Sequence, residues 1–451
     1  MLYETLEGDS SFLLPGLRLE YRDNMCRAYL LVFTAFAVAL IHLAEGQKLV
    51  ANYDESKIPE FDLPDPLLLS SGARITSAGE WEKSGRPATL KLIESEMYGR
   101  MPVGKPAGFK VVLDREVADA IGGKAIRREY LVTFADGKGP EVRMLLYLPK
   151  NRRGPVPAFL GLNFRGNQCV EKDPRITLEL GYVVGSRKGE DRRAKAESMR
   201  GSAAGRWPID MIVESGFALA TACCGNIDPD FDDGWKNGVH PLYTEGVPNP
   251  HEWGTISAWA WGLSRLLDAL EGVEEINAKQ VAVIGHSRLG KTSLWAGATD
   301  PRFQVVISNN SGCGGAALSK RAFGETVGRI NRSFPHWFNG NFKKYNGNEK
   351  ELPFDQHQLI ALMAPRAVYV ASATEDRWAD PRGEFLSLLH AQPVYDLYRK
   401  SSLGVTEMPP AGQSVGTLMG YHLRDGKHDV TPEDWAFYLA FAKRNLGKNP
   451  K

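Results

Sequence analysis

Five continuous apolar runs constrain the fold of this chain more than any other feature of its sequence. They read VPAFLGLN (156–163), FALATACC (217–224), QVAVIG (280–285), FQVVIS (303–308) and AVYVASA (367–373). Continuous apolar runs are typical of strands that are buried on both faces. Helical patterns lie between them, and the segment 255–272 places apolar side chains along one stripe. Strands that alternate with helices predict a parallel sheet with right-handed crossovers.

Three further strand patterns precede these runs. They are GFKVVLDREV (108–117), RREYLVTF (127–134) and EVRMLLYLP (141–149), and we expect them to add antiparallel strands to the sheet. Before them, LIESEMYGRMP (92–102) indicates a helix that ends before its proline. The whole order predicts an α/β fold with a central, mostly parallel sheet, antiparallel N-terminal strands and a three-layer αβα sandwich.

The N-terminal segment has the pattern of a leader. Arg27 precedes AYLLVFTAFAVALIHLA (28–44), an almost entirely apolar run that suits a secretory signal peptide cleaved near residues 44–46. A single N-terminal anchor is the alternative. A start at Met25 would give a signal of conventional length, about twenty residues.

These patterns divide the chain into three parts. We assign residues 1–46 to the signal peptide, 47–80 to a lead-in rich in Pro, Asp and Ser, and 81–448 to a single domain. The protein is therefore expected to be secreted or periplasmic. Its 55 basic and 54 acidic residues give a formal net charge of +1. Such a balance does not favour a nucleic acid or, once the signal is removed, a membrane as partner, and we expect a monomer.

Export would permit disulfides among the four cysteines that follow the leader. None of these cysteines lies in a CxxC or another metal-binding spacing: Cys169, Cys223, Cys224 and Cys313. A disulfide and small buried thiols both remain open. We expect neither a metal nor a cofactor.

The run VAVIGHSRLGKTSLWAGATD (281–300) carries the strongest chemical signal. Ser287 falls where a strand ends, Gly285 permits a sharp turn, and the residues from Gly290 onward indicate a helix. This strand–turn–helix context is that of the nucleophile elbow of α/β-hydrolases. The N–H groups at the start of the helix would face a developing oxyanion. The alternative is a serine that caps an ordinary helix.

A nucleophilic serine needs a base and an acid, which follow it in the order Ser, Asp or Glu, His in this fold. His428 lies in the loop RDGKHDVTPEDW before a final helix, whereas His422 lies in an apolar run that indicates a strand, so His428 is favoured. The acid should follow the strand 367–373, where Glu375, Asp376 and Asp380 are available. Asp376 is the best placed, because it lies three residues beyond the strand.

Two cations accompany the serine. Arg288 stays protonated and so cannot be the base, but its guanidinium can add a charged donor for the oxyanion. Lys291 lies one helical turn beyond Ser287. Two cations beside the nucleophile disfavour a fatty acyl chain and favour a polar, hydroxyl-rich substrate. A solvated helix residue is the alternative for Lys291.

The residues GHSRLGKTSLWAGATD and ISNNSGCGGAAL resemble the glucuronoyl esterases of carbohydrate esterase family 15. The resemblance continues through RGSAAGRWPID, NIDPDFDDGW, EWGTISAWAWGLSRLLDAL, FPHWF, DQHQLIALMAPRAVYVASATEDRWADPRGEF and GYHLRDGKHDVTPEDW, from about residue 92 to 446. It implies an α/β-hydrolase fold and cleavage of esters of glucuronic acid or its 4-O-methyl derivative, such as those that join glucuronoxylan to lignin. It also implies that no metal is used.

The resemblance assigns roles to individual residues. It makes Ser287 the nucleophile, His428 the base and Arg288 an oxyanion stabiliser, and it places Lys291, Glu325 and Trp378 at positions that hold the sugar. The chain departs from the family pattern in one place. Many members carry the triad glutamate where this chain has Asn310, and members that lack it resemble one another in supplying the acid from the loop of Asp376, with Glu375 as the fallback.

Three functions remain to be distinguished. The first is a secreted glucuronoyl esterase that works through Ser287, His428 and Asp376 with help from Arg288. The second is an acetyl-xylan or other carbohydrate esterase on the same scaffold. The third is a carbohydrate-binding protein without catalytic activity, against which the intact serine, arginine and histidine argue.

Overall fold

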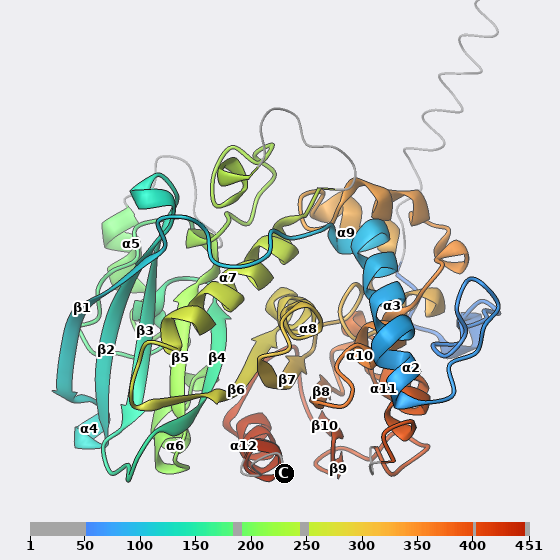
Figure 1. Ribbon diagram of the computed structural model, residues 1–451. Coiled ribbons are helices and arrows are strands. Elements are labelled where there is room, and N and C mark those ends of the chain that lie inside the picture. The colour runs from blue at the N-terminus through green and yellow to red at the C-terminus, as the bar shows by residue number, and fades with distance from the viewer. Residues whose placement is uncertain (1–50, 184–191, 244–251, 400–402, 447–451) are drawn as a thin grey trace, which may run out of the picture. The chain divides into compact units, whose positions relative to one another are not determined.

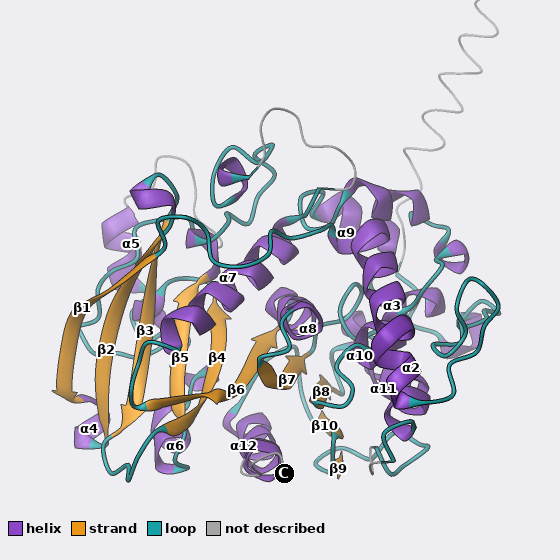
Figure 2. Cartoon of the chain, viewed as in Figure 1, coloured by secondary structure: helices purple, strands orange, loops and turns teal. Residues whose placement is uncertain are grey.

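One mixed sheet of ten strands organises the structure, a computed structural model, in the order β1-β2-β3-β5-β4-β6-β7-β8-β10-β9 (Figures 1 and 2). The strands are β1 (Lys110–Asp119), β2 (Ala125–Thr133), β3 (Glu141–Pro149), β4 (Val156–Asn163), β5 (Ala218–Cys223), β6 (Ile276–His286), β7 (Phe303–Asn309), β8 (Ala367–Ala373), β9 (Ser414–Gly416) and β10 (Met419–Arg424). The six strands from β5 to β10 in this order are parallel, whereas β1, β2, β3 and β9 pair antiparallel. The predicted α/β sheet with antiparallel N-terminal strands is confirmed.

The structure describes residues 51–183, 192–243, 252–399 and 403–446. Its helices are α2 (Ala78–Glu80), α3 (Arg86–Ile93), α4 (Ala120–Gly123), α5 (Arg192–Ser198), α6 (Ile209–Glu214), α7 (Thr255–Leu270), α8 (Arg288–Thr299), α9 (Val327–Ser333), α10 (Gln356–Ala361), α11 (Pro381–Asp396) and α12 (Pro432–Leu446). The predicted signal peptide, 1–46, lies outside the described residues. The described part of the predicted lead-in belongs to the same unit as the sheet, which begins at Ala51.

Two apolar layers cover the two faces of the sheet. Successive residues of a strand alternate between them, so that Val283 packs with α7 and α8, and Ile284 packs with α6 and α12. Figure 1 shows α7 and α8 on one face and α12 on the other. This is the predicted three-layer arrangement, and it explains why the parallel strands are apolar along their whole length.

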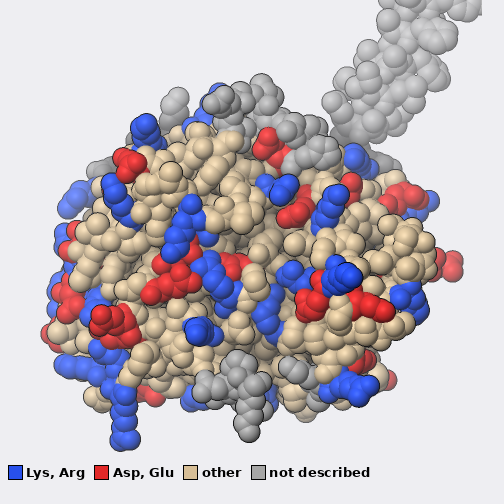
Figure 3. Space-filling view, viewed as in Figure 1, with Lys and Arg blue, Asp and Glu red and all other residues tan. Residues whose placement is uncertain are grey.

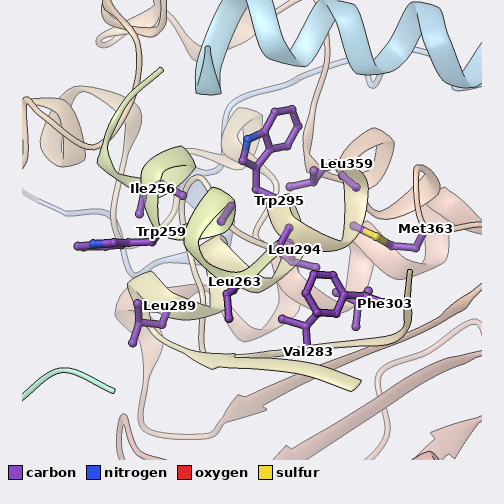
Figure 4. Packing of buried hydrophobic residues seen from close by; sticks show 14 of the residues in the cluster. Ile256, Trp259, Leu263, Val283, Leu289, Leu294, Trp295, Phe303, Leu359 and Met363 are labelled. Atoms are coloured by element: carbon purple, nitrogen blue, oxygen red, sulfur yellow. The ribbon is translucent and has the colours of Figure 1, made fainter. Parts of the chain in front are cut away.

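The helix α7 departs from its sequence pattern. A single apolar stripe predicts one buried face, but every residue of α7 is buried. On its inner side, Leu263 points toward Val283 of β6 and Leu294 of α8 (Figure 4). The Trp259 Nε1 donates a hydrogen bond of 2.8 Å to the Asp228 carbonyl, in the loop after β5. The outer side of α7 is covered as well, because Arg265 donates a hydrogen bond of 2.5 Å to the Gly104 carbonyl and the Trp261 ring packs on Phe134 at 5.1 Å.

The helix expected at 92–102 ends earlier than its proline predicts. The segment continues from α3 through one π-helical turn, Glu94–Tyr98, and stops there. Gly99 then adopts a φ of +78°, and a Cβ at this position would lie 2.4 Å from the Trp253 Cα. Close backbone approach, rather than Pro102, therefore ends the helix.

The described residues show the state of the cysteines and whether any helix could cross a membrane. Their four cysteines, Cys169, Cys223, Cys224 and Cys313, are buried free thiols. None of their helices is both long and apolar enough to cross a membrane. On the face drawn in Figure 3, cationic and anionic side chains are interspersed, as the balanced composition suggests.

The core between α8 and the sheet gives a stability prediction. Leu294 of α8 is fully buried, so we expect Leu294→Ala to lower the free energy of unfolding by about 2–5 kcal/mol in chemical denaturation. Leu113 of β1 is half exposed and serves as the matched control. Leu113→Ala should change the free energy of unfolding by only about 0.5 kcal/mol. Equal losses in both variants would contradict this packing.

Candidate active site

Ser287 occupies a tight turn between β6 and α8. Its backbone has a φ of +60° and a ψ of −129°, which is uncommon for a residue with a side chain and is typical of a nucleophile elbow. The Ser287 N–H donates a hydrogen bond of 2.9 Å to the Asn309 carbonyl at the end of β7. The turn therefore presents the hydroxyl at the carboxyl edge of the sheet, as the sequence predicts.

Gly285 and Gly290, on either side of Ser287, each allow a different close approach of the backbone. A Cβ on Gly285 would lie 1.8 Å from the Leu289 carbonyl oxygen, so only glycine allows the chain to reverse here. A Cβ on Gly290 would lie 3.0 Å from the Ser311 Cβ. Gly290 thus lets α8 approach the loop after β7, which accounts for a glycine three residues beyond the serine.

His428 and Asp376 are hydrogen-bonded to each other. The His428 Nδ1 lies 2.6 Å from the Asp376 Oδ2. A carboxylate accepts at Nδ1, so Nδ1 carries the proton and Nε2 is the free base. Backbone hydrogen bonds join the two loops, since Thr374 N–H donates to the Arg424 carbonyl and Glu375 N–H donates to the Gly426 carbonyl, each at 2.9 Å.

The other acids and the other histidine have different surroundings. The Glu375 side chain is exposed to solvent. Asp380 caps the N-terminus of α11 and pairs with Arg321 at 2.8 Å. His422 lies within β10, where its Nε2 is 2.8 Å from the Asp434 Oδ1. Of the candidates, only Asp376 and His428 come together beside the elbow.

Asn310 touches the acid directly. It has a φ of +47°, and its side-chain Nδ2 donates a hydrogen bond of 2.8 Å to the same Asp376 Oδ2 that faces His428. Asn310 therefore orients the carboxylate of Asp376, which lies in the loop after β8.

Arg288 is held by groups that sequence reasoning did not single out. Its guanidinium pairs with the buried Asp230 and lies over the Trp337 ring, 4.7 Å from its centroid. Asp230 also accepts a hydrogen bond of 2.7 Å from Trp337 Nε1 and lies 3.2 Å from His336 Nε2. Burial opposes the ionised carboxylate, but the hydrogen bond from His336 and the charge of Arg288 lower the pKa of Asp230. Its position in the loop after β5, at the carboxyl edge of the sheet, was the available signal.

Lys291 and Glu325 form a buried pair. Their side chains are 4% and 9% exposed, and Nζ lies 3.9 Å from Oε2. Lys291 also donates to the Ser311 carbonyl. Burial lowers the pKa of Lys291 and raises that of Glu325, while their mutual attraction opposes both shifts. The alternative interpretation of Lys291 as a solvated helix residue is therefore wrong.

Trp378 stands beside this pair. Its carbonyl accepts a hydrogen bond of 3.0 Å from Glu325 N–H, and the residue is 37% exposed. The Arg329 guanidinium lies 5.8 Å from the ring centroid. The three residues predicted to hold a sugar thus gather on the side of the serine where β7 and β8 end, two of them buried and one presenting an aromatic ring to solvent.

Two buried charged side chains hold the loops of the candidate site in place. Arg424 donates hydrogen bonds of 2.8 Å to the Lys427 carbonyl and 3.2 Å to the Asp429 carbonyl, on either side of His428. Glu384 accepts from the N–H groups of Ser311 and Gly312 at 2.7 and 2.9 Å, and burial raises its pKa to about 8. Both residues lie in sequence stretches that carry the family resemblance, but the sequence assigned neither a role, because the partners of Glu384 come from distant parts of the chain.

A cavity of about 630 Å³ opens at this edge of the sheet, and Ser287, Arg288 and His428 line it. The arrangement combines an elbow hydroxyl, an imidazole with a free Nε2, an oriented carboxylate and cationic donors near a helix N-terminus. These are the groups that acyl transfer through a covalent intermediate requires. Among the described residues, no group of three or more His, Cys, Asp or Glu side chains could hold a metal ion.

Comparisons with known proteins agree with this chemistry. A family model described as glucuronyl esterase, fungi, matches residues 217–398. A carbohydrate esterase from an unknown prokaryotic organism is 47% identical over 400 residues, which cover 88% of this chain and 92% of the relative.

Two solved structures are also similar. A glucuronoyl esterase from Solibacter usitatus has a TM-score of 0.82 and 44% identity, and the match covers 87% of this chain and 100% of that one. A structure described as a promiscuous CE15 esterase from a marine bacterial metagenome has a TM-score of 0.80 and 46% identity, with 88% and 100% covered. The α/β-hydrolase type of fold follows from these matches as well as from the sheet.

The choice of acid can be tested by substitution. We expect Asp376→Asn to lower kcat by about 10⁴-fold, because the imidazole loses the partner that fixes its tautomer and balances its charge. Glu375→Gln, the matched control, should have a mild effect, and Asp380→Asn should act through stability. Asn310→Glu in the Asp376→Asn background should restore part of the rate. Steady-state kinetics would contradict the assignment if Asp376→Asn kept most of its activity.

Proposed function

Because the chain belongs to the glucuronoyl esterases of carbohydrate esterase family 15, we propose that it hydrolyses esters of glucuronic acid or 4-O-methyl-glucuronic acid through Ser287. The observation that carries this proposal is the His428–Asp376 hydrogen bond of 2.6 Å beside a serine in an elbow turn. The family acts on esters that link glucuronoxylan to lignin, and these are the proposed substrates.

Acylation begins when His428 Nε2 removes the proton of the Ser287 hydroxyl. The oxygen attacks the uronate ester carbonyl, and the resulting oxyanion is stabilised by N–H groups at the start of α8 and by the Arg288 guanidinium. The Arg288 guanidinium pairs with Asp230 through Nη1, and Arg288 lines the cavity beside Ser287. The tetrahedral intermediate collapses, the ester C–O bond breaks, and the alcohol leaves with the proton from His428.

Deacylation repeats these steps with water. His428 takes a proton from the water, the hydroxide attacks the acyl carbon, and the Ser287 oxygen recovers its proton as glucuronate departs. The His428 side chain is 41% exposed, which allows water to reach it. No step requires a metal or cofactor.

The acid part of the substrate is proposed to lie against Lys291, Glu325 and Trp378. A buried ammonium and a buried carboxylate offer donors and an acceptor for sugar hydroxyls, and the tryptophan offers a face for the ring. An apolar acyl chain in the same place would remove their solvation without replacing it. This arrangement favours a uronic acid over a fatty acid.

The proposed setting is extracellular or periplasmic. The apolar segment 28–44 has the pattern of a signal peptide, and polymeric glucuronoxylan and lignin lie outside cells. The enzyme is proposed to act as a monomer, with no nucleic-acid or membrane partner after the signal is removed.

A broader carbohydrate esterase activity is the second candidate. The observation that favours it is the marine bacterial relative, which is described as promiscuous. The two functions differ in their preferred acid. A comparison of kcat/KM on methyl glucuronate, methyl galacturonate and acetylated xylan separates them, and faster cleavage of acetylated xylan than of methyl glucuronate would favour the second.

The nucleophile is tested by Ser287→Ala on benzyl glucuronate. We expect a loss of about 10⁴-fold or more in kcat with the fold retained, because the alanine variant cannot form the acyl-enzyme. A serine-reactive phosphonate should label the wild type but not this variant. Near-normal turnover by a folded variant would contradict the mechanism.

The sugar contacts are tested by Lys291→Met and Glu325→Gln. Loss of a hydrogen-bonding partner in a desolvated site costs about 1–3 kcal/mol, so we expect kcat/KM on methyl glucuronate to fall by about 5- to 150-fold. Hydrolysis of 4-nitrophenyl acetate, which has no sugar, should change far less. Equal losses on both substrates would show that the pair supports the structure rather than recognition.

A further inference from the structure

A segment near the start of the described chain lies against the residues that are proposed to hold the sugar. The sequence predicts only a lead-in here, but residues 52–57, named the strap below, contact two loops of the candidate site. The loop 321–325 ends at Glu325, and the loop 376–380 contains Trp378. The strap itself has no part in the mechanism described above.

The two loops are packed on each other. The Glu325 N–H donates a hydrogen bond of 3.0 Å to the Trp378 carbonyl. Gly324 has a φ of +65°, and a Cβ at this position would lie 2.5 Å from the same carbonyl oxygen, so glycine is needed for this close approach. Glu325 and Trp378 are therefore linked through their backbones, and a contact that holds one loop also holds the other.

The strap holds the first loop through its backbone. The Asn52 carbonyl accepts a hydrogen bond of 2.8 Å from the N–H of Gly324, which directly precedes Glu325. Asn52 is fixed in turn, because its Oδ1 accepts a hydrogen bond of 2.9 Å from the Asp54 N–H. The backbone at Glu325 is consequently bonded to the strap on one side and to the loop of Trp378 on the other.

An aromatic ring of the strap reaches both loops. The Tyr53 ring packs edge-on against the buried Phe323, with their centroids 6.1 Å apart. The Arg377 guanidinium lies 5.5 Å from the Tyr53 centroid and 5.6 Å from the Phe323 centroid, where both rings attract its charge. Because Arg377 directly precedes Trp378, Tyr53 helps to hold the loop of the tryptophan as well as that of Glu325.

A row of charged side chains also crosses the strap and the two loops. The Arg321 side chain is 5% exposed, and it donates hydrogen bonds of 2.8 Å to Glu55 Oε1 and 2.8 Å to Asp380 Oδ2. Asp380 is buried and also accepts from the Gly383 N–H at 3.0 Å. A buried guanidinium requires partners for its donors, and Glu55 of the strap supplies one of them.

We propose that the strap is a specificity element of this enzyme, in which Tyr53 and Glu55 are positioning residues for Glu325 and Trp378. This inference rests on the proposed function, since it assigns the support of the site for the acid half of the ester. The Glu325 carboxylate lies 3.9 Å from the Lys291 Nζ in a buried environment. A small shift of its loop would therefore change the donors and acceptors that meet the sugar hydroxyls.

The catalytic acid is held independently of the strap. Asp376 begins the second loop, but its N–H donates a hydrogen bond of 3.1 Å to the Ala373 carbonyl, and its carboxylate accepts from Asn310 at 2.8 Å. The neighbouring Glu375 N–H bonds to the Gly426 carbonyl. Loosening the strap should consequently disturb recognition of the sugar while leaving the hydrolysis of a simple ester intact.

The test compares kcat/KM on methyl glucuronate with kcat/KM on 4-nitrophenyl acetate, which has no sugar. Tyr53→Leu should lower the first by about tenfold, because a misplacement of about 1 Å costs up to about 10²-fold, and should leave the second within about twofold. Tyr53→Phe keeps the ring and should restore the selectivity of the wild type. Glu55→Leu tests a second position and should lower the first by about threefold, because its ion pair is half exposed.

Lys57→Gln is the matched control within the strap. Its side chain is 74% exposed and its ammonium pairs with Asp54 at 3.3 Å, so neither substrate should be affected. In a Glu325→Gln, Trp378→Leu background, Tyr53→Leu should cost no more than about a further twofold, since the residues that it positions are already gone.

Three outcomes would overturn the role of the strap. They are unchanged selectivity in the folded Tyr53→Leu and Glu55→Leu variants, equal losses on both substrates, and a further tenfold loss from Tyr53→Leu in the Glu325→Gln, Trp378→Leu background. A wild type that hydrolyses 4-nitrophenyl acetate but no glucuronate ester would overturn the proposed function itself.

Discussion

The carboxylate of Asp376 joins the ends of three neighbouring strands. Its Oδ2 accepts from Asn310 after β7 and faces His428 after β10, while Asp376 itself follows β8. Each of these loops also holds something else in place, since Ser287 N–H bonds to the carbonyl of Asn309 and Arg424 brackets the histidine. One connected set of hydrogen bonds therefore fixes the positions of the elbow turn, His428 and Asp376. Displacing any of the three strand ends would displace the imidazole from the hydroxyl.

Two cations one helical turn apart have unlike environments. The Arg288 guanidinium lies partly exposed against a carboxylate and two aromatic rings, whereas the Lys291 ammonium is buried with Glu325 and a carbonyl. The first can meet a charge that appears and disappears during a reaction. The second can hold a polar group that stays. Their sequence spacing shows that they share a helix face, but burial and partners decide what each one does.

The sequence predicts the parts of this structure that depend on local pattern. The strands 156–163 and 367–373 have the predicted bounds. Asp376, in the loop after the second of these strands, lies beside His428, because strand order and loop position carry that information. The complete burial of α7 was not predictable, since the segments that cover its outer side lie far away in the chain. The same applies to Asp230 and Glu384. Their places in the sequence do not reveal the buried donors that surround them.

The pairing of Arg288 with Asp230 has a consequence for the end of the catalytic cycle. Hydrolysis of a neutral ester leaves an anion, and an unpaired guanidinium beside the nucleophile would bind that anion strongly. Here the carboxylate of Asp230 already offsets the charge of Arg288, and His336 and Trp337 hold that carboxylate in position. In the proposed mechanism, Arg288 would attract the transient oxyanion at short range, while Asp230 would weaken its hold on the anionic product. A permanent counter-ion on the arginine would then limit inhibition by the enzyme's own product.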